Sequence, residues 1–521
     1  MTEKAASEVV FDERRLSIED IVDLATRRRR AKLSADPEFV AQINRGAELI
    51  DRLLREEGVV YGVTTGYGDS CTVAIPSSLV AELPRQLYTF HGLGLGAALD
   101  EAQSRAVLAV RLASFCRRLS GVSYPLLRQI EQLLIHDILP VIPAEGSVGA
   151  SGDLTPLSYV AAVVCGERDV LDAGRRRPAA DALRERGITP LKLRPKEGLA
   201  IMNGTAVMTA LGCLAFQRAA YLSQLATRIT AFSVLAVAGN PHHFDATLFA
   251  AKPHPGQQRV AARLRFDLGG DVPGRNEHRL QDRYSLRCAP HVIGVLEDAL
   301  PFFRTLIENE INSANDNPLV EAEQERVLHG GHFYGGHIAF AMDSLKALVA
   351  SVADLLDRQV ALLLDPKFNH GLPANLTGAS RQRLPINHGL KALSIGASAW
   401  TAEALKLTMP AASFSRSTEC HNQDKVSMGT IAARDCLRVL ELSEQVAVAA
   451  LFAATQGLDL RVREGGIQRE QLPDGLQRMH VAFREHIPFL GEDRALEPEL
   501  RHLLDLVRAE AFELYPAGDI A

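Results

Sequence analysis

Long runs of helical periodicity are the feature that most constrains this fold. Between residues 338 and 364, apolar side chains recur every three or four positions without Gly or Pro, until Asp365-Pro366 ends the run. Similar patterns cover residues 207–238, 289–312, 387–408 and 427–456. Helices of this length, with apolar residues around much of their circumference, form bundles or pack against other subunits. The sequence therefore predicts a mainly α fold with a long-helix bundle core.

The first part of the chain has a different character, because it is smaller, mixed and loop-rich. Gly and Pro cluster at residues 57–78 and 139–157, and strand-like runs are short, as at residues 58–65. We expect an N-terminal domain over residues 1–205, and a long-helix bundle with further C-terminal helices over residues 206–521. The loop segments hold most of the unusual polar residues, and functional groups are often carried on loops by a rigid scaffold.

Composition and charge bear on the class of protein. The 521 residues are 47% hydrophobic, and the net charge of −6 leaves no basic footprint for nucleic acid or an anionic membrane. The apolar runs at 207–238 and 338–364 contain charged side chains, so neither is expected to span a membrane. The seven cysteines form no C-x-x-C pair, and the N-terminus lacks an apolar signal segment. We expect a cytoplasmic protein with no metal site and no nucleic-acid or membrane partner.

The segment from Gly146 to Tyr159, GSVGASGDLTPLSY, has small residues at its centre and helix-start chemistry behind them. Asp153 is able to serve as an N-cap, and Pro156 lies in the first turn of the helix that follows. One interpretation of the segment is simply a Gly-rich turn before a helix.

A second interpretation of the same segment is chemical. In a compressed loop, the backbone nitrogen of Gly152 attacks the carbonyl carbon of Ala150, and one water leaves as a five-membered ring closes. Loss of a second water turns the Ser151 side chain into an exocyclic methylidene. Small residues on both sides permit the strained approach. The product would be an electrophile that no ordinary side chain provides.

Two further segments carry side chains suited to proton transfer and carboxylate binding. In YGVTTGYG (residues 61–68), glycines beside Tyr61 predict either a mobile loop that presents a phenol or a tight hairpin in which Tyr61 packs. In QDRYSLR (residues 281–287), Tyr284 and Arg287 share one face at a helix start, and the guanidinium suits a carboxylate. A surface Arg beside an amphipathic Tyr is the equally open alternative.

Asparagine-rich and mixed polar segments complete the set. Asn203 precedes a glycine, and Asn residues cluster in INSANDNPL (residues 311–319), where turns and caps explain them well. The string ECHNQDKVSMG (residues 419–429) precedes a long helix. Capping explains Asp424 or Ser427, but not the whole string.

Together these strings resemble those of the aromatic amino acid ammonia-lyases, namely the histidine, phenylalanine and tyrosine ammonia-lyases and the related aminomutases. Six motifs occur in the family's order between residues 61 and 461, so the resemblance covers nearly the whole chain. It implies a mostly helical fold and an autocatalytic methylidene-imidazolone prosthetic group, without metal or nucleotide. It also implies homotetramers whose active sites draw on several subunits.

The resemblance further implies roles for individual residues. Ala150, Ser151 and Gly152 would form the prosthetic group, and Tyr61 would take the β-proton of the substrate. Tyr61 serves as a base only if its surroundings lower the phenol pKa towards working pH. Tyr284 would assist in amine handling or cyclisation. The residues expected to contact substrate are Arg287 and Asn203 at the carboxylate, Gln281 and Gln423 along the site, Phe333 against the prosthetic ring, Phe90 and His91 at the substrate ring, and His332.

Three positions bear on which ring is bound. Phe90-His91 matches neither the Phe-Leu of phenylalanine enzymes, nor the His-Leu of tyrosine enzymes, nor the Ser-His of histidine enzymes and tyrosine aminomutases. Phe90 suits an aromatic ring, whereas His91 either hydrogen-bonds a phenol or imidazole or is purely structural. Gln423 resembles the phenylalanine and tyrosine enzymes, since histidine enzymes carry Glu there. His332 replaces the Asn that is usual in the family, so this chain departs from the family pattern at a residue expected to contact the substrate.

The expected activity is elimination of ammonia from tyrosine or phenylalanine to give a trans-arylacrylate, coumarate or cinnamate. Three alternatives stay open: a histidine ammonia-lyase giving urocanate, an aromatic 2,3-aminomutase, and a non-catalytic homologue that only binds an aromatic amino acid. An all-α lyase of the fumarase type is disfavoured because its GSSxMPxKxN-type loop is missing.

Overall fold

The computed structural model describes residues 7–56, 58–270, 276 and 279–515. It is mainly helical, which confirms the predicted fold class. The chain forms two compact units. The first comprises the chain up to Gln217, with Phe303–Asp343 and Pro410–Arg434, and the second comprises Arg218–Phe302, Ser344–Met409 and the chain from Asp435 onward. This grouping differs from a single cut after residue 205, and the two-domain boundary expected there stays a prediction.

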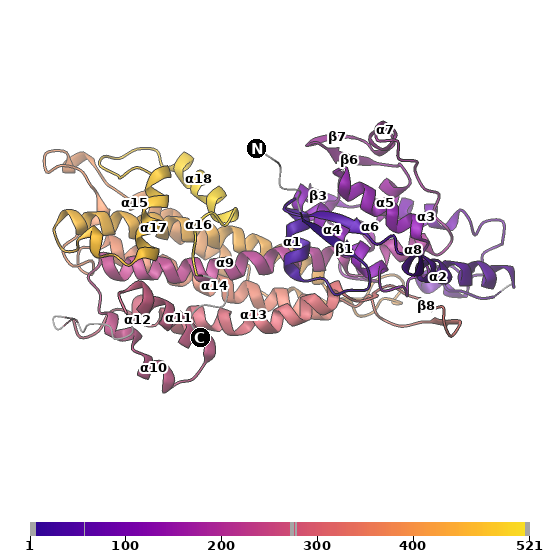
Figure 1. Ribbon diagram of the computed structural model, residues 1–521, viewed down its shortest axis with the longest axis horizontal. Helices are drawn as coiled ribbons and strands as arrows, with labels where there is room; N and C mark the ends of the chain where they lie inside the picture. The colour runs from indigo at the N-terminus through magenta and orange to yellow at the C-terminus, as the bar shows by residue number, and fades with distance from the viewer. Residues whose placement is uncertain (1–6, 57, 271–275, 277–278, 516–521) are drawn as a thin grey trace. The chain divides into compact units, whose positions relative to one another are not determined.

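The first unit combines short helices with small sheets (Figure 1). Helix α4 is buried on every face from Ser104 to Phe115 and therefore lies at the centre of this unit. The helices of the first unit are α1 (Ile18–Ala25), α2 (Pro37–Arg55), α3 (Leu83–Phe90), α4 (Glu101–Phe115), α5 (Tyr124–Ile135), α6 (Leu154–Val164), α7 (Ala179–Glu185) and α8 (Glu197–Met202), with the 3-10 helices η1 (Gly68–Thr72) and η5 (Ala411–Phe414).

The strands of the first unit pair in four small sheets. Strands β6 and β7 form a hairpin in which Ala173 and Gly174 both have positive φ, as the tight turns of hairpins require. The pairings are β1 (Glu8–Phe11) with β2 (Arg30–Leu33), β3 (Leu95–Ala98) with β5 (Pro143–Glu145), β4 (Ile138–Pro140) with β6 (Asp169–Asp172) and β7 (Arg175–Pro178), and β8 (Leu319–Glu321) with β9 (Arg326–Leu328).

The second unit is built from helices (Figure 1). The division between the two units falls inside the four longest helices, α9 (Ala206–Ala236), α13 (Ala289–Ile311), α14 (Gly336–Leu364) and α16 (Gly429–Arg463). The other helices of the second unit are η2 (Pro241–Phe244), α10 (Ala246–Ala250), α11 (Pro255–Asp267), α12 (Tyr284–Arg287), η3 (Ala374–Leu376), η4 (Leu384–Ile386), α15 (Lys391–Lys406), η6 (Arg469–Gln471), α17 (Asp474–His486) and α18 (Glu497–Arg508).

The long helices agree closely with the periodic segments of the sequence, with one extension. Helix α16 continues to Arg463, seven residues beyond the predicted end at residue 456. Gly457 does not break it, because a Cβ at this position would lie only 3.1 Å from the Cβ of Ala236 on α9. The glycine lets two helices approach closely, and tertiary packing outweighs its low helix propensity.

The strand-like run at residues 58–65 does not form a strand. The backbone turns at Tyr61, and the carbonyl of Val60 accepts hydrogen bonds from the N–H groups of Val63 and Thr64. The Thr64 hydroxyl accepts from the Val60 N–H at 2.8 Å. Threonine side chains that bond the local backbone compete with strand pairing, which is why the strand predicted at residues 58–65 does not form.

The described residues contain neither a helix able to cross a membrane nor a cluster of metal ligands. No helix there combines the necessary length with the necessary apolar character. Over the same residues, no group of three or more His, Cys, Asp or Glu side chains is arranged to hold a metal ion. The seven cysteines are free thiols.

Candidate active site

A cavity of about 660 Å³ in the first unit gathers most of the predicted site residues. It is enclosed by the turn at Tyr61, the end of α3, the tripeptide segment before α6, residues 317–334 and residues 419–426. We call it the tripeptide cavity. Of the predicted residues, those that line it are Tyr61, Phe90, His91, Ala150, Ser151, Asn203, Phe333 and Gln423.

The tripeptide adopts a backbone conformation that ordinary residues avoid. Ser151 and Gly152 both have positive φ, at 51° and 78°. A Cβ at Gly152 would overlap the carbonyl group of Gly204, which runs alongside. A non-glycine residue with positive φ costs energy and persists only where the surroundings enforce it. The fold therefore holds Ser151 in a strained turn that requires glycine immediately after it.

Hydrogen bonds hold the carbonyl oxygen and the hydroxyl of Ser151. Its carbonyl oxygen accepts from the side-chain amide of Asn203 at 2.8 Å and from the Gly204 N–H at 3.3 Å. Its hydroxyl accepts from the side-chain amide of Gln423 at 3.0 Å. Asn203 is itself held, since its side-chain oxygen accepts from the Asn317 N–H at 2.6 Å. Residues far apart in the chain thus converge on one serine.

Asp153 holds the tripeptide through contacts with other helices, and it does not cap its own helix as the sequence predicted. Helix α6 begins without a side-chain cap from Asp153. Its buried carboxylate instead accepts from the N–H groups of Val207 and Met208 at the start of α9, each at 3.0 Å, and from the Thr430 hydroxyl on α16. Burial raises the pKa of Asp153 to about 6, although these hydrogen bonds act to lower it. The residue therefore ties the tripeptide to the first turns of two long helices.

Tyr61 presents its phenol to the cavity from a short turn. The hydroxyl accepts a hydrogen bond from the Gly68 N–H at 2.7 Å. Burial raises the pKa of Tyr61 above its ordinary value, the Gly68 bond opposes this, and the charge of Glu419 adds to it. The lowered phenol pKa that a base needs is therefore not supplied by these surroundings.

Glu419 is a cavity residue that the sequence interpretation missed. Its two carboxylate oxygens accept from the Asp69 N–H at 3.0 and 3.1 Å, and they lie where a Cβ of Gly68 would be. The available signal was the polar string at 419–429, which helix capping did not fully explain. Glu419 links that string to the segment that carries Tyr61.

The end of α3 forms another wall of the cavity through Phe90 and His91. Their ring centroids lie 4.2 Å apart. His91 Nδ1 lies 2.9 Å from the carbonyl oxygen of Leu87, which only accepts, so Nδ1 carries the proton. Burial lowers the pKa of His91, and the positive charge of Arg168 acts in the same direction. A neutral imidazole with a protonated Nδ1 leaves Nε2 as a hydrogen-bond acceptor.

Comparison with known proteins agrees with this geometry. A model of the family described as aromatic amino acid lyase matches residues 16–485. The chain belongs to the aromatic amino acid lyase family. It is a carbon–nitrogen lyase, as the resemblance of its motifs predicted.

Relatives of this lyase cover nearly its whole length. It is 34% identical to a histidine ammonia-lyase of Alkaliphilus oremlandii over 96% of both chains. It is 37% identical to the histidine ammonia-lyase of Bos taurus over 94% of this chain and 74% of that protein. The solved tyrosine aminomutase of Streptomyces globisporus matches 97% of both chains at 34% identity, with a TM-score of 0.90.

The remaining predicted residues of the lyase are not among those that line the tripeptide cavity. His332 is exposed and lies beside Gly330. Gln281, Tyr284 and Arg287 belong to the second unit, around a separate cavity of about 550 Å³. We call this the cationic cavity, because its basic side chains outnumber its one carboxylate, that of Asp282. The basic residues are Arg279, Arg283, Arg287, Lys367 and His370.

Within the cationic cavity, Tyr284 and Arg287 share one face of α12, as their spacing predicted. The Arg287 guanidinium lies 4.7 Å from the centre of the Tyr284 ring, and its Nε donates to the Asp282 carbonyl at 3.0 Å. The Nε atom makes this bond, so the bond does not use the two terminal nitrogens of the fork. The arrangement is suited to a bidentate contact with a carboxylate.

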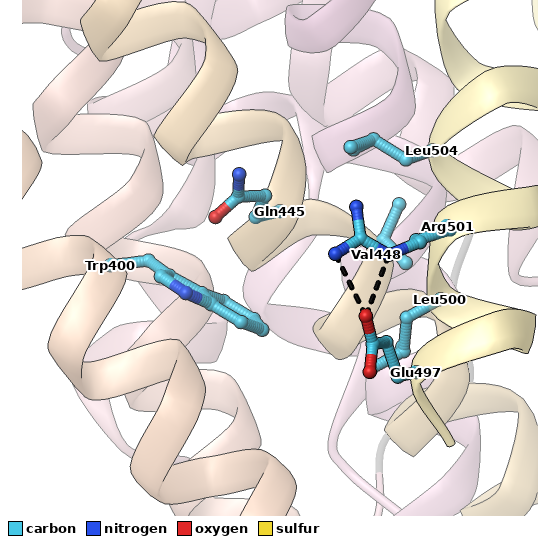
Figure 2. A pocket seen from close by; sticks show the side chains of 7 residues that line it. All are labelled: Trp400, Gln445, Val448, Glu497, Leu500, Arg501 and Leu504. Carbon is cyan, nitrogen blue, oxygen red and sulfur yellow. Dashed lines mark hydrogen bonds and ion pairs between the residues drawn. The ribbon is translucent and has the colours of Figure 1, made fainter. Parts of the chain in front are cut away.

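A third cavity, of about 410 Å³, also belongs to the second unit of the lyase (Figure 2). Trp400 of α15 faces Val448 and Gln445 of α16 across it, and Glu497 pairs with Arg501 on α18 at 2.8 Å. None of the predicted site residues lines it. It offers no nucleophile or strained backbone, so the tripeptide cavity is the candidate active site.

Proposed function

We propose that this lyase eliminates ammonia from tyrosine or phenylalanine, giving trans-coumarate or trans-cinnamate. The observation that supports this choice of substrate ring is the protonation of His91 at Nδ1. Its proton is committed to the Leu87 carbonyl, so Nε2 offers an acceptor for a phenol, and Phe90 offers an aromatic surface beside it. A ring with a hydroxyl, or a bare phenyl ring, fits these two neighbours.

The residues at the tripeptide fit a methylidene-imidazolone, the prosthetic group that this family uses. Gly152 has no room for a side chain, Ser151 is held at positive φ, and the Ser151 carbonyl receives two N–H groups. Ala150, Ser151 and Gly152 would form the group, and Asn203 and Gln423 would hold it. When present, the group supplies an electrophile that makes the substrate amine a better leaving group.

The chain's own residues supply proton transfer. Tyr61 is proposed to take the β-proton, which requires its phenolate form. The neighbours of Tyr61 raise its pKa, so the positive charge that favours a phenolate must come from elsewhere. The substrate ammonium and the arginine that binds its carboxylate are the two sources we propose.

Carboxylate binding is proposed to involve a second copy of the chain. Among the described residues that line the tripeptide cavity, Lys425 is the one Lys or Arg. Arg287, with Tyr284 and Gln281, lines the cationic cavity of the second unit. We propose a homotetramer in which these three side chains complete the tripeptide cavity of another subunit. The guanidinium fork would then orient the substrate carboxylate.

Histidine is the competing substrate, because the curated relatives reported above are histidine ammonia-lyases. Nε2 of His91 would also accept from an imidazole N–H. Gln423 supplies no negative charge for an imidazole, and its amide is already engaged with Ser151 and Thr418. An aminomutase is the other competitor, since the solved relative from Streptomyces globisporus is a tyrosine aminomutase.

The test is an assay of purified protein with tyrosine, phenylalanine and histidine, following arylacrylate absorbance, free ammonia and β-amino acids. We expect the highest kcat/KM for tyrosine or phenylalanine and no β-amino acid. A higher kcat/KM for histidine, or accumulation of β-amino acid, would replace this proposal with the corresponding alternative. Turnover of none of the three would support a binding protein.

The same preparations test the prosthetic group. Ser151→Ala should lose both activity and the near-UV absorbance of the group, and borohydride should do the same to the wild type. Ser70→Ala, which removes another hydroxyl from the same cavity, should keep the absorbance. An active Ser151→Ala enzyme would overturn the proposed chemistry.

A further inference from the structure

We infer that Arg168 is a positioning residue that holds the ring-recognition turn, residues 87–92, against helix α6 and so contributes to the choice of substrate ring. The inference rests on the proposed function, in which Phe90 and His91 contact the ring. Arg168 does not line the tripeptide cavity, and its action is through the backbone of this turn.

The guanidinium of Arg168 makes two hydrogen bonds, one of them to the turn itself. One terminal nitrogen donates to the carbonyl oxygen of Tyr88. The other donates to the Ser158 hydroxyl at 3.0 Å; that hydroxyl lies 2.7 Å from the Thr155 carbonyl oxygen of its own helix and 3.2 Å from the carbonyl oxygen of His91. Arg168 thus binds one backbone carbonyl of the turn directly, and it holds Ser158, which lies within hydrogen-bond distance of a second.

A positive charge suits this place because α3 ends there. The last turn of a helix leaves carbonyl groups without partners, and a cation near them is favourable. Helix α3 has no basic residue in its own last turn. Arg168 supplies the charge from outside the helix, and its guanidinium also lies 4.3 Å from the centre of the Tyr159 ring.

Two backbone features show that the fold is built around this contact. Arg168 itself has a φ of 63°, which costs energy for any residue with a side chain. Gly92 lies against the guanidinium so closely that a Cβ would overlap a terminal nitrogen of Arg168. An arginine with positive φ and a closely packed glycine therefore meet at the end of the ring-recognition turn.

The contact also connects the two ends of the substrate site. Helix α6 begins directly after the tripeptide, carries Ser158, and is followed four residues later by Arg168. The same short stretch of chain thus sets the positions of Ser151 and of His91. Loss of the clamp frees the ring end while leaving the tripeptide anchored by Asp153.

The consequence for catalysis is a change in binding more than in chemistry. A ring contact that is equal in the ground state and the transition state affects KM and leaves kcat nearly unchanged. Hydrogen bonds from a charged donor are among the stronger ones, so their loss should raise KM for the preferred amino acid about tenfold. The preference between ring types should shrink accordingly.

The experiment compares Arg168→Met, which removes both hydrogen bonds, with Arg168→Lys, which keeps the charge and one donor. The matched control is Arg85→Met on helix α3, where the exposed Arg85 pairs with Glu167. We expect Arg168→Met to raise KM with kcat within about threefold, Arg168→Lys to restore part of the loss, and Arg85→Met to behave as wild type.

Hydrogen exchange provides a readout that needs no substrate. The amides of Gly92 and Leu93, which bond to Thr89 and His91, should exchange faster in Arg168→Met than in wild type or Arg85→Met. Unchanged exchange, or equal losses of kcat for all three amino acids without a KM effect, would overturn the inference. If wild type turns over no aromatic amino acid, the proposed function fails, and exchange at these amides still decides whether Arg168 holds the turn.

Discussion

At the scale of single residues, the two tyrosines of one short motif both line the tripeptide cavity, but their hydroxyl groups differ in hydrogen bonding. The Tyr61 hydroxyl accepts from the Gly68 N–H and lines the tripeptide cavity. The Tyr67 hydroxyl is buried without a hydrogen-bond partner among the described residues, and burial raises its pKa well above the ordinary value. A base needs an accessible phenolate, so only Tyr61 is suited to that work.

This difference predicts the behaviour of two matched variants. Tyr61→Phe should lower kcat by about 10²- to 10⁴-fold, the usual contribution of a general base, whereas Tyr67→Phe should stay within about threefold. Steady-state kinetics on the preferred amino acid measures both. Equal losses of kcat in the two variants would show that the hydroxyl of Tyr61 does not act as the general base.

The same residue predicts the pH profile. Because burial raises the pKa of Tyr61, its phenolate is scarce near neutrality and becomes more abundant as pH rises. At substrate concentrations well below KM, kcat/KM should therefore rise with pH until the phenol of the free enzyme is titrated, and this rise should be absent in Tyr61→Phe. A flat wild-type profile between about pH 7 and pH 10 would contradict a Tyr61 base.

At the scale of elements, the segment after Tyr61 is organised by contacts from a distant loop. Residues 68–72 form a 3-10 helix whose Asp69 N–H is bound by both oxygens of Glu419. The sequence predicted a mobile loop or a tight hairpin over residues 61–68, directly before this helix. The side chain that decides the conformation lies 350 positions away, so no window of the sequence around Tyr61 contains it.

The Glu419 contact predicts a measurable change in local opening. Glu419→Ala should speed hydrogen exchange at the Asp69 amide by about 10-fold or more, since a bond to a charged acceptor is lost. Glu419→Gln retains a neutral acceptor and should give an intermediate rate. Exchange followed by mass spectrometry measures both, and identical rates in all three proteins would show that Glu419 does not hold this segment.

At the scale of the whole molecule, the proposed machinery is divided between the two units of the chain. Tyr61 and Ser151 line the tripeptide cavity of the first unit, whereas Arg287 and Tyr284 line the cationic cavity of the second. If subunits complete each other's sites, two different inactive variants should restore activity when they assemble together.

Mixed assembly tests this directly. Tyr61→Phe and Arg287→Ala are each expected to be nearly inactive, and their co-assembly should recover activity at sites that pair an intact Tyr61 with an intact Arg287. The control is co-assembly of Tyr61→Phe with Ser151→Ala, which should stay inactive because both residues line one cavity of one chain. Without recovery in the first mixture, the proposal of shared sites would be wrong.

Much of this protein was determined by local sequence. The long helices follow from apolar spacing and from stop signals such as Asp365-Pro366, and the α16 extension past Gly457 is the main departure. The motif strings predicted the family, and they contain most of the residues that line the tripeptide cavity. These features lie within short windows, because helix periodicity and motif spacing are local properties of a chain.

Only the tertiary structure decided how those residues are held. Asp153 was expected to cap its own helix but caps α9 and contacts α16, and the Ser151 carbonyl is bound by Asn203 from another segment. Arg168 gave no signal in the sequence, yet it binds the end of α3. Buried polar groups bond whichever partner the fold brings within reach, and that choice depends on contacts between distant segments that no local pattern records.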